Sequence, residues 1–498
     1  MSKSEITEPK RRLDRERRPD ARPSHDPHWW LFCVLILALK LCLLAFDSLP
    51  KLFMGDSGSY LWTALTGWIP DDRSYFYGYV IRYSSLGTGS LTPLLILQMF
   101  AGTTTALVLA WICRSIFELS ARVSYIFGFL CALDPLQLIW ERYVLTESLS
   151  LCLYAFALER SLAYLKHQRI RDVVLVQLVS VLLIGFRMSY LLVVQITAIC
   201  LPLIALLTGL WTRSDQRPAN SLSRLALARS ASGHFLLSVI AMLGLHAGYK
   251  QVNGFLSQRE PGYLYATGLH LLAAWAPALR SADASDPRLA ELIDKGAEFH
   301  IKDMSLRNAQ RYAPGYLVQQ WLALEANAVK ANQVAKQTSL RALVRNPGAI
   351  LRLAGRTFLG YWDIPLIKNY AKHDLGHVNL SKEDLALLAQ KFHWATPQEI
   401  IQTSSLLRRY FLAAWPYYLV VVLSPLWSVI LIRLAPEKKY AVLLFFHSSI
   451  MLATTLLFAE APSVRYLQPL SLVTLALMAA YARIAMDYPR IASTSTPR

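Results

Sequence analysis

The most regular feature of the sequence is a series of apolar runs separated by short polar segments. Each run approaches the ~20 residues that a helix needs to cross the hydrocarbon core of a bilayer. A soluble fold of this size does not need so many separate apolar runs, so the pattern predicts an all-α polytopic membrane protein with about ten transmembrane helices. We expect them at about 29–47, 90–113, 123–141, 147–165, 172–186, 189–211, 233–250, 410–433, 440–459 and 463–484.

The charges of the connecting segments predict the orientation of these helices. Basic residues gather in every second connection, and short basic connections stay in the cytoplasm. This rule places both termini inside, as cytoplasmic tails 1–28 and 485–498. The region 172–211 must then form two helices, because basic segments flank it on both sides. The remaining connections face outward, and they are 48–89, a turn near 142–146, a turn near 187, 251–409 and 460–465.

The outer connection 251–409 is too long for a linker, so we expect it to fold as a domain between the seventh and eighth helices. It divides the membrane part into an N-terminal module, 29–250, and C-terminal helices, 410–484. Between residues 340 and 362, arginines alternate with apolar residues. That pattern indicates either a basic amphipathic helix on the membrane surface or a helix packed within the domain.

Composition agrees with a membrane protein and removes one alternative. Hydrophobic residues make up 54% of the 498 residues, and the formal net charge is +18. A charge of that size can indicate nucleic-acid binding, but here the basic residues lie largely in the short segments between apolar runs. We therefore expect a multi-pass protein of an inner or plasma membrane that contacts the lipid bilayer and binds no nucleic acid.

With this orientation, an unusual set of polar residues meets at the outer face of the membrane. The first loop, 48–89, contains the sequence Gly55-Asp56-Ser57-Gly58-Ser59-Tyr60. Ionisable groups at a membrane boundary inside a helix bundle are costly to hold and usually have a function. The candidate catalytic residues are Asp56 and Glu147, and the candidate substrate-binding residues are Tyr60, Arg82, Arg142, Arg187, Arg465 and Tyr466.

Four short motifs in this set resemble those of one enzyme family. They are Asp56 with Tyr60, Asp134-Pro135 followed by Thr146-Glu147, Gly185-Phe186-Arg187, and Arg465-Tyr466 followed by Pro469. In this order they are similar to the motifs of polyprenyl-phosphate-sugar glycosyltransferases with the multi-spanning GT-C fold. That family includes protein O-mannosyltransferases and the aminoarabinose transferase that acts on lipid A. Many members have a second acidic residue beside the first-loop aspartate, where this chain has Ser57.

The resemblance implies a glycosyltransferase with a polyprenyl-phosphate-linked sugar as donor and a hydroxyl of a glycan, lipid or protein as acceptor. A positioned carboxylate suits the proton transfer from that hydroxyl, and this role falls to Asp56. Glu147 is expected to bind or orient the acceptor or a metal. Arg187 and Arg465 are expected to bind phosphate, because a guanidinium group binds its oxygens in pairs. No cofactor is expected, although a divalent metal is compatible with this chemistry.

Each candidate residue also has a purely structural interpretation. Asp56 would cap a short surface helix, Glu147 would interact with the dipole of its own helix, and Arg187 would anchor a turn among headgroups. Arg465 would form a surface ion pair with Glu460. Asp71-Asp72 is interpreted as a turn rather than a site.

Two isolated signals remain. His373 and His377 have the spacing of a metal pair on one helix face, but Gly376 argues against a helix there. Lys40 lies midway along the first apolar run, where it would either pair inside the bundle or mark a substrate path, and a buried structural partner is the preferred interpretation.

Other functions are compatible with part of the pattern. A transporter or flippase of lipid-linked glycans would distribute its functional charges across the bilayer and show internal repeats, and neither is visible. An outer-face glycan polymerase or ligase would carry its main residues in the large loop. A scaffold without enzymatic activity would tolerate Asp56→Asn.

Overall fold

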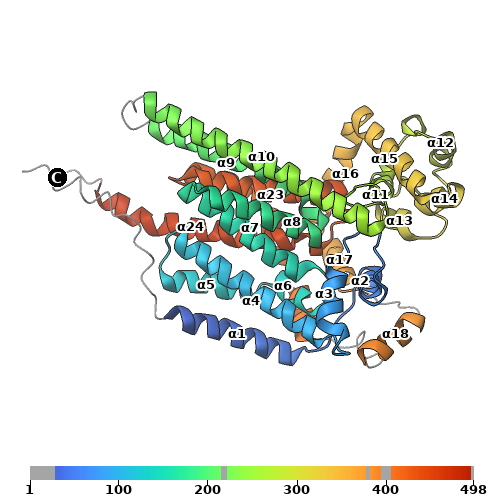
Figure 1. Cartoon of the computed structure of the whole chain (residues 1–498), viewed down its shortest axis with the longest axis horizontal. Helices are drawn as coiled ribbons and strands as arrows, with labels where there is room; N and C mark the ends of the chain where they lie inside the picture. Colours follow the sequence, from blue (N-terminus) through green and yellow to red (C-terminus); the bar gives the residue numbers. More distant parts are fainter. Residues whose placement is uncertain (1–27, 215–220, 377–381, 394–404, 495–498) are drawn as a thin grey trace, which may run out of the picture.

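The computed structural model describes residues 28–214, 221–376, 382–393 and 405–494. These residues form helices and no strand, which confirms the all-α prediction. The first predicted tail, 1–28, lies outside the described residues except for His28, and His377 lies outside them as well. The second predicted tail, 485–498, is described as far as Thr494, and there it continues the last helix. The long helices run side by side as a bundle (Figure 1). They are α1 (His28–Phe46), α4 (Thr92–Ser115), α5 (Ala121–Ala132), α7 (Glu147–His167), α8 (Ile170–Phe186), α9 (Leu191–Ser214), α10 (Ser221–Ser257), α22 (Ser424–Leu434), α23 (Lys438–Phe458) and α24 (Gln468–Thr494).

Several of these helices are suited to cross a membrane. Among the described residues, six are long and apolar enough, and two bent pairs raise the number to eight if each pair is one span. The bent pairs are Ala121–Ala132 with Pro135–Arg142, and Trp415–Val422 with Ser424–Leu434. The chain is therefore a multi-pass membrane protein by the length and composition of its helices.

The two other predicted spans correspond to α7 and α8, which do not meet the same standard. Helix α8 has only 17 residues. Helix α7 contacts α4, α8, α23 and α24, so protein rather than lipid covers most of it, and polar side chains are tolerated there. The count of ten spans stays a prediction.

The region 172–211 is divided into two helices, as predicted. Helix α8 ends at Phe186 and α9 begins at Leu191, with the short helix η4 (Met188–Tyr190) before it. Arg187 has an extended backbone, with φ −146° and ψ 109°, which ends α8.

A buried ion pair lies inside the bundle. Lys40 Nζ is 2.5 Å from Glu141 Oε1, and both side chains have no exposed surface. Lys40 comes from α1 and Glu141 from the short helix η3 (Trp140–Arg142), which follows α6 (Pro135–Leu138). This contact confirms that Lys40 pairs inside the bundle.

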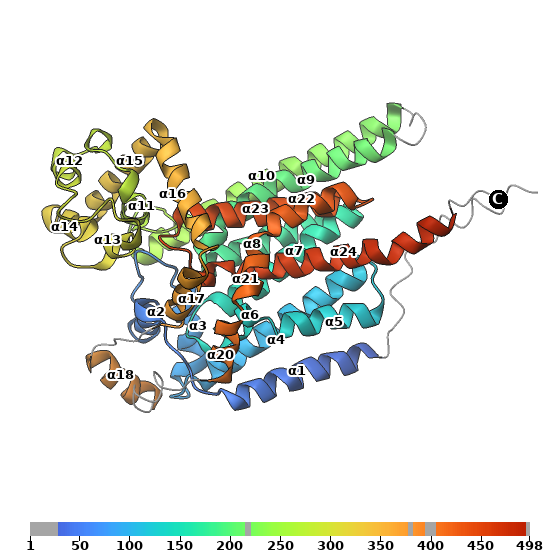
Figure 2. The same ribbon diagram turned by 180° about the vertical axis from the view of Figure 1, so that it is seen from behind.

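A second group of helices gathers at one end of the bundle, at the left in Figure 2. We name α11 to α17 the end helices: α11 (Thr267–Ala274), α12 (Pro287–Asp294), α13 (Ala309–Tyr312), α14 (Leu317–Leu324), α15 (Ala328–Arg345), α16 (Pro347–Gly360) and α17 (Ile364–Asp374), with η5 (Ala276–Ala278), η6 (Ser281–Asp283) and η7 (Met304–Leu306) between them. Part of this group has its own hydrophobic core around the buried Trp321. The start of α1 and the described end of α24 both lie at the opposite end of the bundle, apart from each other (Figure 1).

The prediction of one helix over residues 340–362 was wrong. Helix α15 ends at Arg345 and α16 begins at Pro347, with Asn346 between them at φ −140° and ψ 52°. A proline disfavours the helical conformation of the residue before it, so Asn346 ends the first helix.

The remaining short helices lie near the junction of the bundle and the end helices. They are α2 (Met54–Thr66), α3 (Phe76–Ile81), the π-helix η2 (Arg82–Leu86), α18 (Lys382–Phe392), α20 (Leu406–Ala413), α21 (Trp415–Val422) and η8 (Val464–Leu467). Helix α2 is tied to the bundle at its start, because Ser57 Oγ accepts a hydrogen bond from Phe53 N (2.8 Å) and donates one to the carbonyl of Val144 (2.9 Å). Ser57 thus fixes the loop that carries Asp56.

Candidate active site

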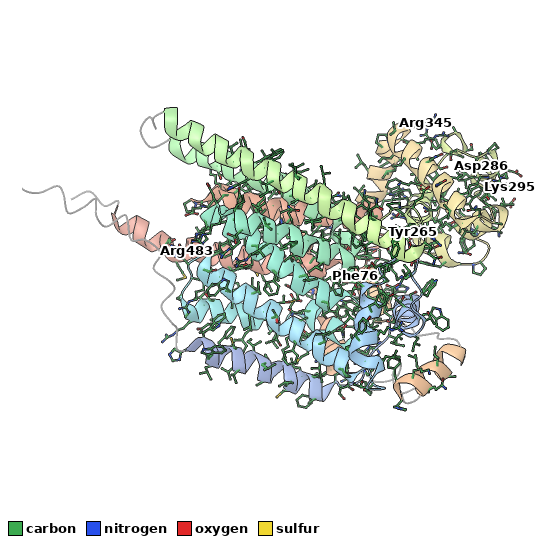
Figure 3. The ribbon with its side chains drawn as sticks, viewed as in Figure 1. Phe76, Tyr265, Asp286, Lys295, Arg345 and Arg483 are labelled. Atoms are coloured by element: carbon green, nitrogen blue, oxygen red, sulfur yellow. The ribbon has the colours of Figure 1, made fainter. Side chains whose placement is uncertain are left out.

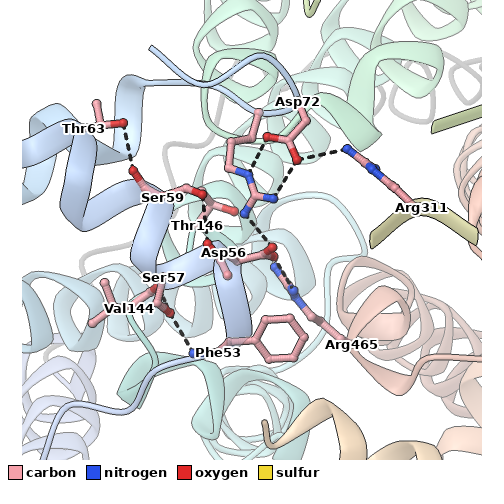
Figure 4. Close-up of polar contacts among 12 residues, drawn as sticks. Phe53, Asp56, Ser57, Ser59, Thr63, Asp72, Val144, Thr146, Arg311 and Arg465 are labelled. Atoms are coloured by element: carbon pink, nitrogen blue, oxygen red, sulfur yellow. Dashed lines mark hydrogen bonds and ion pairs between the residues drawn. The ribbon is translucent and has the colours of Figure 1, made fainter. Parts of the chain in front are cut away.

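Asp56 lies in the first turn of α2 and is held by two arginines from other parts of the chain (Figure 4). Arg73 Nη1 donates to Asp56 Oδ1 at 2.5 Å, and Arg465 Nη1 donates to Oδ2 at 2.8 Å. The N-cap residue of α2 is Phe53, so Asp56 does not cap this helix. Its carboxylate is about one quarter exposed, at 26%, so it remains accessible at the junction.

Arg465 connects Asp56 to Glu147. Its Nε donates to Glu147 Oε1, and Arg187 Nη1 lies 3.5 Å from the same oxygen. Glu147 is the first residue of α7 and is completely buried, so it is held by cations rather than by water. The surface ion pair between Arg465 and Glu460 was a wrong alternative, because Arg465 is buried and pairs with Asp56 and Glu147.

The charges continue from Arg73 toward the end helices. Arg73 donates two hydrogen bonds to Asp72, from Nε at 3.0 Å and from Nη2 at 2.8 Å. Arg311 of α13 donates to the same carboxylate at 3.0 Å. Residues 71–73 form a bend, as the turn interpretation predicted, and Asp72 takes part in these ion pairs as well. The carboxylate of Asp71 pairs instead with Arg259 (2.7 Å), and its carbonyl accepts hydrogen bonds from the backbone of Tyr265 and Ala266.

We name this line of side chains the charged row. Its members alternate in sign and come from five separate segments of the chain: Arg187, Glu147, Arg465, Asp56, Arg73, Asp72 and Arg311. Four arginines meet three carboxylates, so the row has one excess positive charge. A site with that balance favours an anion.

A further carboxylate fixes the backbone at Arg465. Asp374, the last residue of α17, accepts a hydrogen bond from Arg465 N (3.0 Å), and its two carboxylate oxygens share the one from Ser463 Oγ (2.9 and 3.0 Å). Burial raises the pKa of Asp374, and these hydrogen bonds act in the opposite direction. The end of α17 therefore positions the segment that supplies Arg465.

Aromatic rings surround the arginines of the row. The guanidinium carbon of Arg465 lies 4.3 Å from the centre of the Phe53 ring, that of Arg73 lies 5.8 Å from Tyr60, and that of Arg187 lies 5.9 Å from Tyr466. Cations near ring faces are attracted to them, and the attraction is stronger where the cation is removed from water. Flat faces of this kind also suit the apolar faces of sugar rings.

The protonation state of Asp56 follows from two opposing effects. Burial raises its pKa, but Arg73 and Arg465 together lower it well below the usual range. Asp56 is therefore ionised at neutral pH. While both arginines bind it, it is also a weak base, because protonation would remove two favourable charge contacts.

The structure brings together six of the eight predicted site residues: Asp56, Glu147, Arg187, Arg465, Tyr60 and Tyr466. It does not bring Arg82 or Arg142 into the charged row. Arg82 is half-buried at the start of η2, and Arg142 is completely buried with its Nη1 3.7 Å from Glu141 Oε2. Their role in substrate binding stays a prediction without a supporting contact among the described residues.

Sequence reasoning missed Arg73, Asp72 and Arg311 as members of the site. A signal existed for the first two, because Asp71-Asp72-Arg73 lies in the same loop as Asp56. Arg311 had none, since it lies 239 positions after Asp72 in a segment without a recognisable motif.

Metal binding has no ready-made site in the described part of the chain. No group of three or more His, Cys, Asp or Glu side chains there is arranged to hold a metal ion. Helix α17 ends at Asp374, one residue after His373, and Gly376 has φ +76°, which is not a helical conformation. The cations that contact Asp56 are guanidinium groups.

An apolar groove of about 550 Å³ lies beside the site, lined by Tyr75, Phe76, Tyr79, Val80, Tyr83, Ser84 and Leu97. Phe76 connects it to the charged row, because its ring packs against Phe186, the neighbour of Arg187, at 6.1 Å between centroids. Figure 3 shows Phe76 near the ends of the bundle helices. A lipid chain in this groove would have its head close to the row.

Comparison with known proteins adds no relative. No protein-family model, curated protein or solved structure matches this chain. The family resemblance of the four motifs stays a prediction.

The site also borders a carboxyl group that makes stability depend on pH. Burial raises the pKa of Glu460 to about 7, with Arg311 and Arg307 acting in the opposite direction. His270 Nδ1 lies 3.6 Å from Glu460 Oε1, and burial, with help from Arg311, lowers the pKa of His270 to about 4, so this imidazole is neutral. Between its ordinary value of 4.5 and about 7, Glu460 binds a proton in the folded state only. Stability therefore falls as pH rises through this window.

We expect Glu460→Gln to raise Tm at pH 8 and to lose this advantage near pH 5. The expected gain in the free energy of unfolding is roughly 3 kcal/mol above pH 7, from the difference between the folded and ordinary pKa of Glu460. Thermal unfolding of the purified protein in detergent at both pH values measures the effect. Glu298→Gln, at an exposed position, is the control and should change Tm little at either pH. A Glu460→Gln advantage that is equal at both pH values would contradict the titration.

Proposed function

We propose that this protein is an integral membrane glycosyltransferase that transfers a sugar from a polyprenyl-phosphate donor to an acceptor hydroxyl. The proposal includes a GT-C-like fold with about ten spans, cytoplasmic termini and a site at the outer face of an inner or plasma membrane. The end helices would form the outer domain predicted for 251–409. The family resemblance of the motifs supports the same activity.

One observation carries the proposal: Asp56 lies between the guanidinium groups of Arg73 and Arg465. Both groups bind a carboxylate in the same way as they would bind two oxygens of a phosphate. A phosphate at this position would compete with Asp56 for its own partners. Donor binding and activation of Asp56 would thus be one event.

The chemical step follows from this exchange. The donor phosphate takes over contacts of Arg465 and Arg73, and Asp56 loses part of the charge stabilisation that keeps it a weak base. Asp56 then accepts the proton of the acceptor hydroxyl while the oxygen of that hydroxyl bonds to the anomeric carbon of the sugar. The bond from this carbon to the phosphate oxygen breaks, and its electron pair leaves on the phosphate. A single displacement of this kind inverts the anomeric centre.

Glu147 and Arg187 act through Arg465 in this scheme. Glu147 accepts a hydrogen bond from Nε of Arg465, and this contact directs Nη1 of Arg465 toward Asp56. Arg187 lies on the other side of Glu147 and extends the positive region toward the groove at Phe76. The leaving phosphate is stabilised by arginines and needs no general acid.

Lipid analysis of cells tests the proposal. We would extract lipids from cells with the wild-type protein, with a deletion, and with Asp56→Asn, and measure polyprenyl-phosphate sugars by mass spectrometry. Loss of the base is expected to slow transfer about 10²–10⁴-fold, so one sugar-carrying lipid should accumulate in both defective strains. Asp294→Asn, at an exposed position of α12, is the matched control and should resemble wild type.

Two outcomes would contradict the proposal. If Asp56→Asn resembled wild type while the deletion accumulated the lipid, the base would lie elsewhere, and a flippase or a loop-centred polymerase or ligase would explain the phenotype better. If neither strain changed any polyprenyl-phosphate sugar, the donor class would be wrong.

A further inference from the structure

The corner between α15 and α16 exposes apolar and basic side chains together. Val344 is 79% exposed, and Leu351 and Leu359 are each 64% exposed. Arg341, Arg345, Arg352 and Arg356 are exposed as well. A water-facing helix rarely displays so many large aliphatic side chains next to one another, so this surface calls for a partner.

The two kinds of residue occupy adjacent strips of α16. Leu351 and Leu359 are eight positions apart with Gly355 between them, so they lie along one line of the helix. Arg352 and Arg356 are four positions apart and form the neighbouring line. An apolar strip bordered by arginines is the arrangement of a helix that lies in a membrane interface.

The opposite face of α16 fixes its height relative to the bundle. Ile350 and Leu353 are buried in a small core with Trp275, and Leu457 and Phe458 at the end of α23 pack against the same core. Trp275 Nε1 also donates to the carbonyl of Leu457 at 2.8 Å. Because α23 is one of the helices suited to cross a membrane, α16 lies where that span leaves the bilayer.

The figures show where the exposed face is directed. In Figures 1 and 2, α16 crosses the end of α23 and its first turns reach beyond the outline of the bundle. Figure 3 places Arg345 at one edge of the end helices, away from Lys295 at their far side. A bilayer around the bundle would therefore meet α16 and not α12.

The charge of the segment specifies the lipid. Residues 328–362 contain six lysines and arginines and no acidic residue. Arg341 and Arg345 donate to the carbonyls of Ala284 (3.1 Å) and Ala282 (2.5 Å), so their charges are fixed at this surface. Arginine forks bind phosphate groups in pairs. Anionic phospholipids offer such groups at the height of α16.

We propose that α16 is a second membrane contact of this protein. Leu351 and Leu359 enter the interface of the leaflet at this end of the bundle, and Arg352 and Arg356 bind the headgroups of anionic phospholipids. The contact needs the membrane spans but does not depend on glycosyl transfer. It fixes the end helices, which supply Arg311 to the charged row, relative to the bilayer.

Fluorescence quenching by lipids tests this contact. The full chain with Leu351→Cys or Lys295→Cys is labelled with a nitrobenzoxadiazole maleimide, and the parent chain gives the background from its native cysteines. Vesicles are made of phosphatidylcholine with or without about 30% phosphatidylglycerol, each with a spin-labelled lipid as quencher. We expect quenching at position 351 and none at 295, where the side chain is exposed just after the end of α12.

Charge reversal separates lipid binding from simple proximity. Each arginine near an anionic surface favours the bound position about fivefold, so Arg352→Glu with Arg356→Glu should remove most of the quenching at 351 in vesicles with phosphatidylglycerol. Lys295→Glu, the matched control, should leave that quenching unchanged. Equal quenching of the labels at positions 351 and 295 would refute the membrane contact. Equal quenching with and without phosphatidylglycerol would refute the binding of anionic headgroups.

Discussion

Arg465→Gln is expected to abolish glycosyl transfer and to destabilise the fold. Arg465 is the central member of the charged row, because it pairs with both Asp56 and Glu147. Loss of one preorganised cation at the leaving phosphate costs about 10²–10³ in rate. Glu147 is completely buried and would keep Arg187, at 3.5 Å, and a hydrogen bond of 3.4 Å from Thr146 Oγ1. Removal of one partner from a buried pair costs about 3–5 kcal/mol.

The two effects can be measured separately. Transfer is assayed at equal amounts of folded protein, and stability is measured as Tm in detergent. Arg465→Lys keeps a charge but loses the fork that joins two carboxylates, so it should recover more stability than activity. Arg433→Gln, at the exposed end of α22, is the control. An Arg465→Gln protein with normal transfer would remove Arg465 from the proposed phosphate site.

Glu141→Gln is expected to give the largest loss of stability without altering the charged row. Lys40 and Glu141 are both completely buried, 101 positions apart in the chain. A glutamine at 141 would leave the ammonium group of Lys40 in the bundle without its carboxylate, and it would also remove the carboxylate from the buried guanidinium group of Arg142, 3.7 Å away. Such a change costs about 3–5 kcal/mol in a protein interior. We expect a strongly lowered Tm.

A double variant distinguishes loss of the pair from loss of packing. Lys40→Met combined with Glu141→Gln removes both charges of the pair, and replacement of a buried pair by uncharged side chains is often close to neutral. Arg142 loses the carboxylate of Glu141 in the double variant and in Glu141→Gln alike, so the double variant should be more stable than Glu141→Gln, which also leaves the ammonium group of Lys40 without its carboxylate. If the three variants were equally unstable, the packing of these side chains and not their charges would matter. Trp321→Phe, in the separate core of the end helices, is an unrelated core control.

The helices of the bundle were predictable because a long apolar run is a property of neighbouring residues in the sequence and does not depend on distant segments. The runs around α1, α4 and α23 are long and apolar, and the structure has helices there. The division of 172–211 followed from charge alone, and Arg187 stands at the break. The bends at Leu133–Asp134 and at Leu423 could not be predicted from the sequence. A proline follows each bend, but proline is common in the first turn of any helix, so it does not by itself indicate a bend.

The candidate site was only half predictable, for a related reason. Asp56, Glu147, Arg187 and Arg465 each mark the end of an apolar run, where a charge is conspicuous. Arg311 lies among many other charged residues of 251–409, and nothing local connects it to Asp72. Ion pairs between distant segments depend on how the end helices dock. Docking is decided by tertiary packing and not by local sequence.

The row also has a consequence for how the protein is made. Asp56 and Glu147 receive their shared cation from position 465, which is synthesised 409 residues after Asp56. Until then the first part of the bundle holds two carboxylates without that counter-ion. A nascent chain that stops before residue 465 therefore has neither a complete site nor a neutralised interior. Completion of synthesis therefore completes the charged row through one guanidinium group, and the unfinished chain differs from the finished one in the charge balance around Asp56 and Glu147.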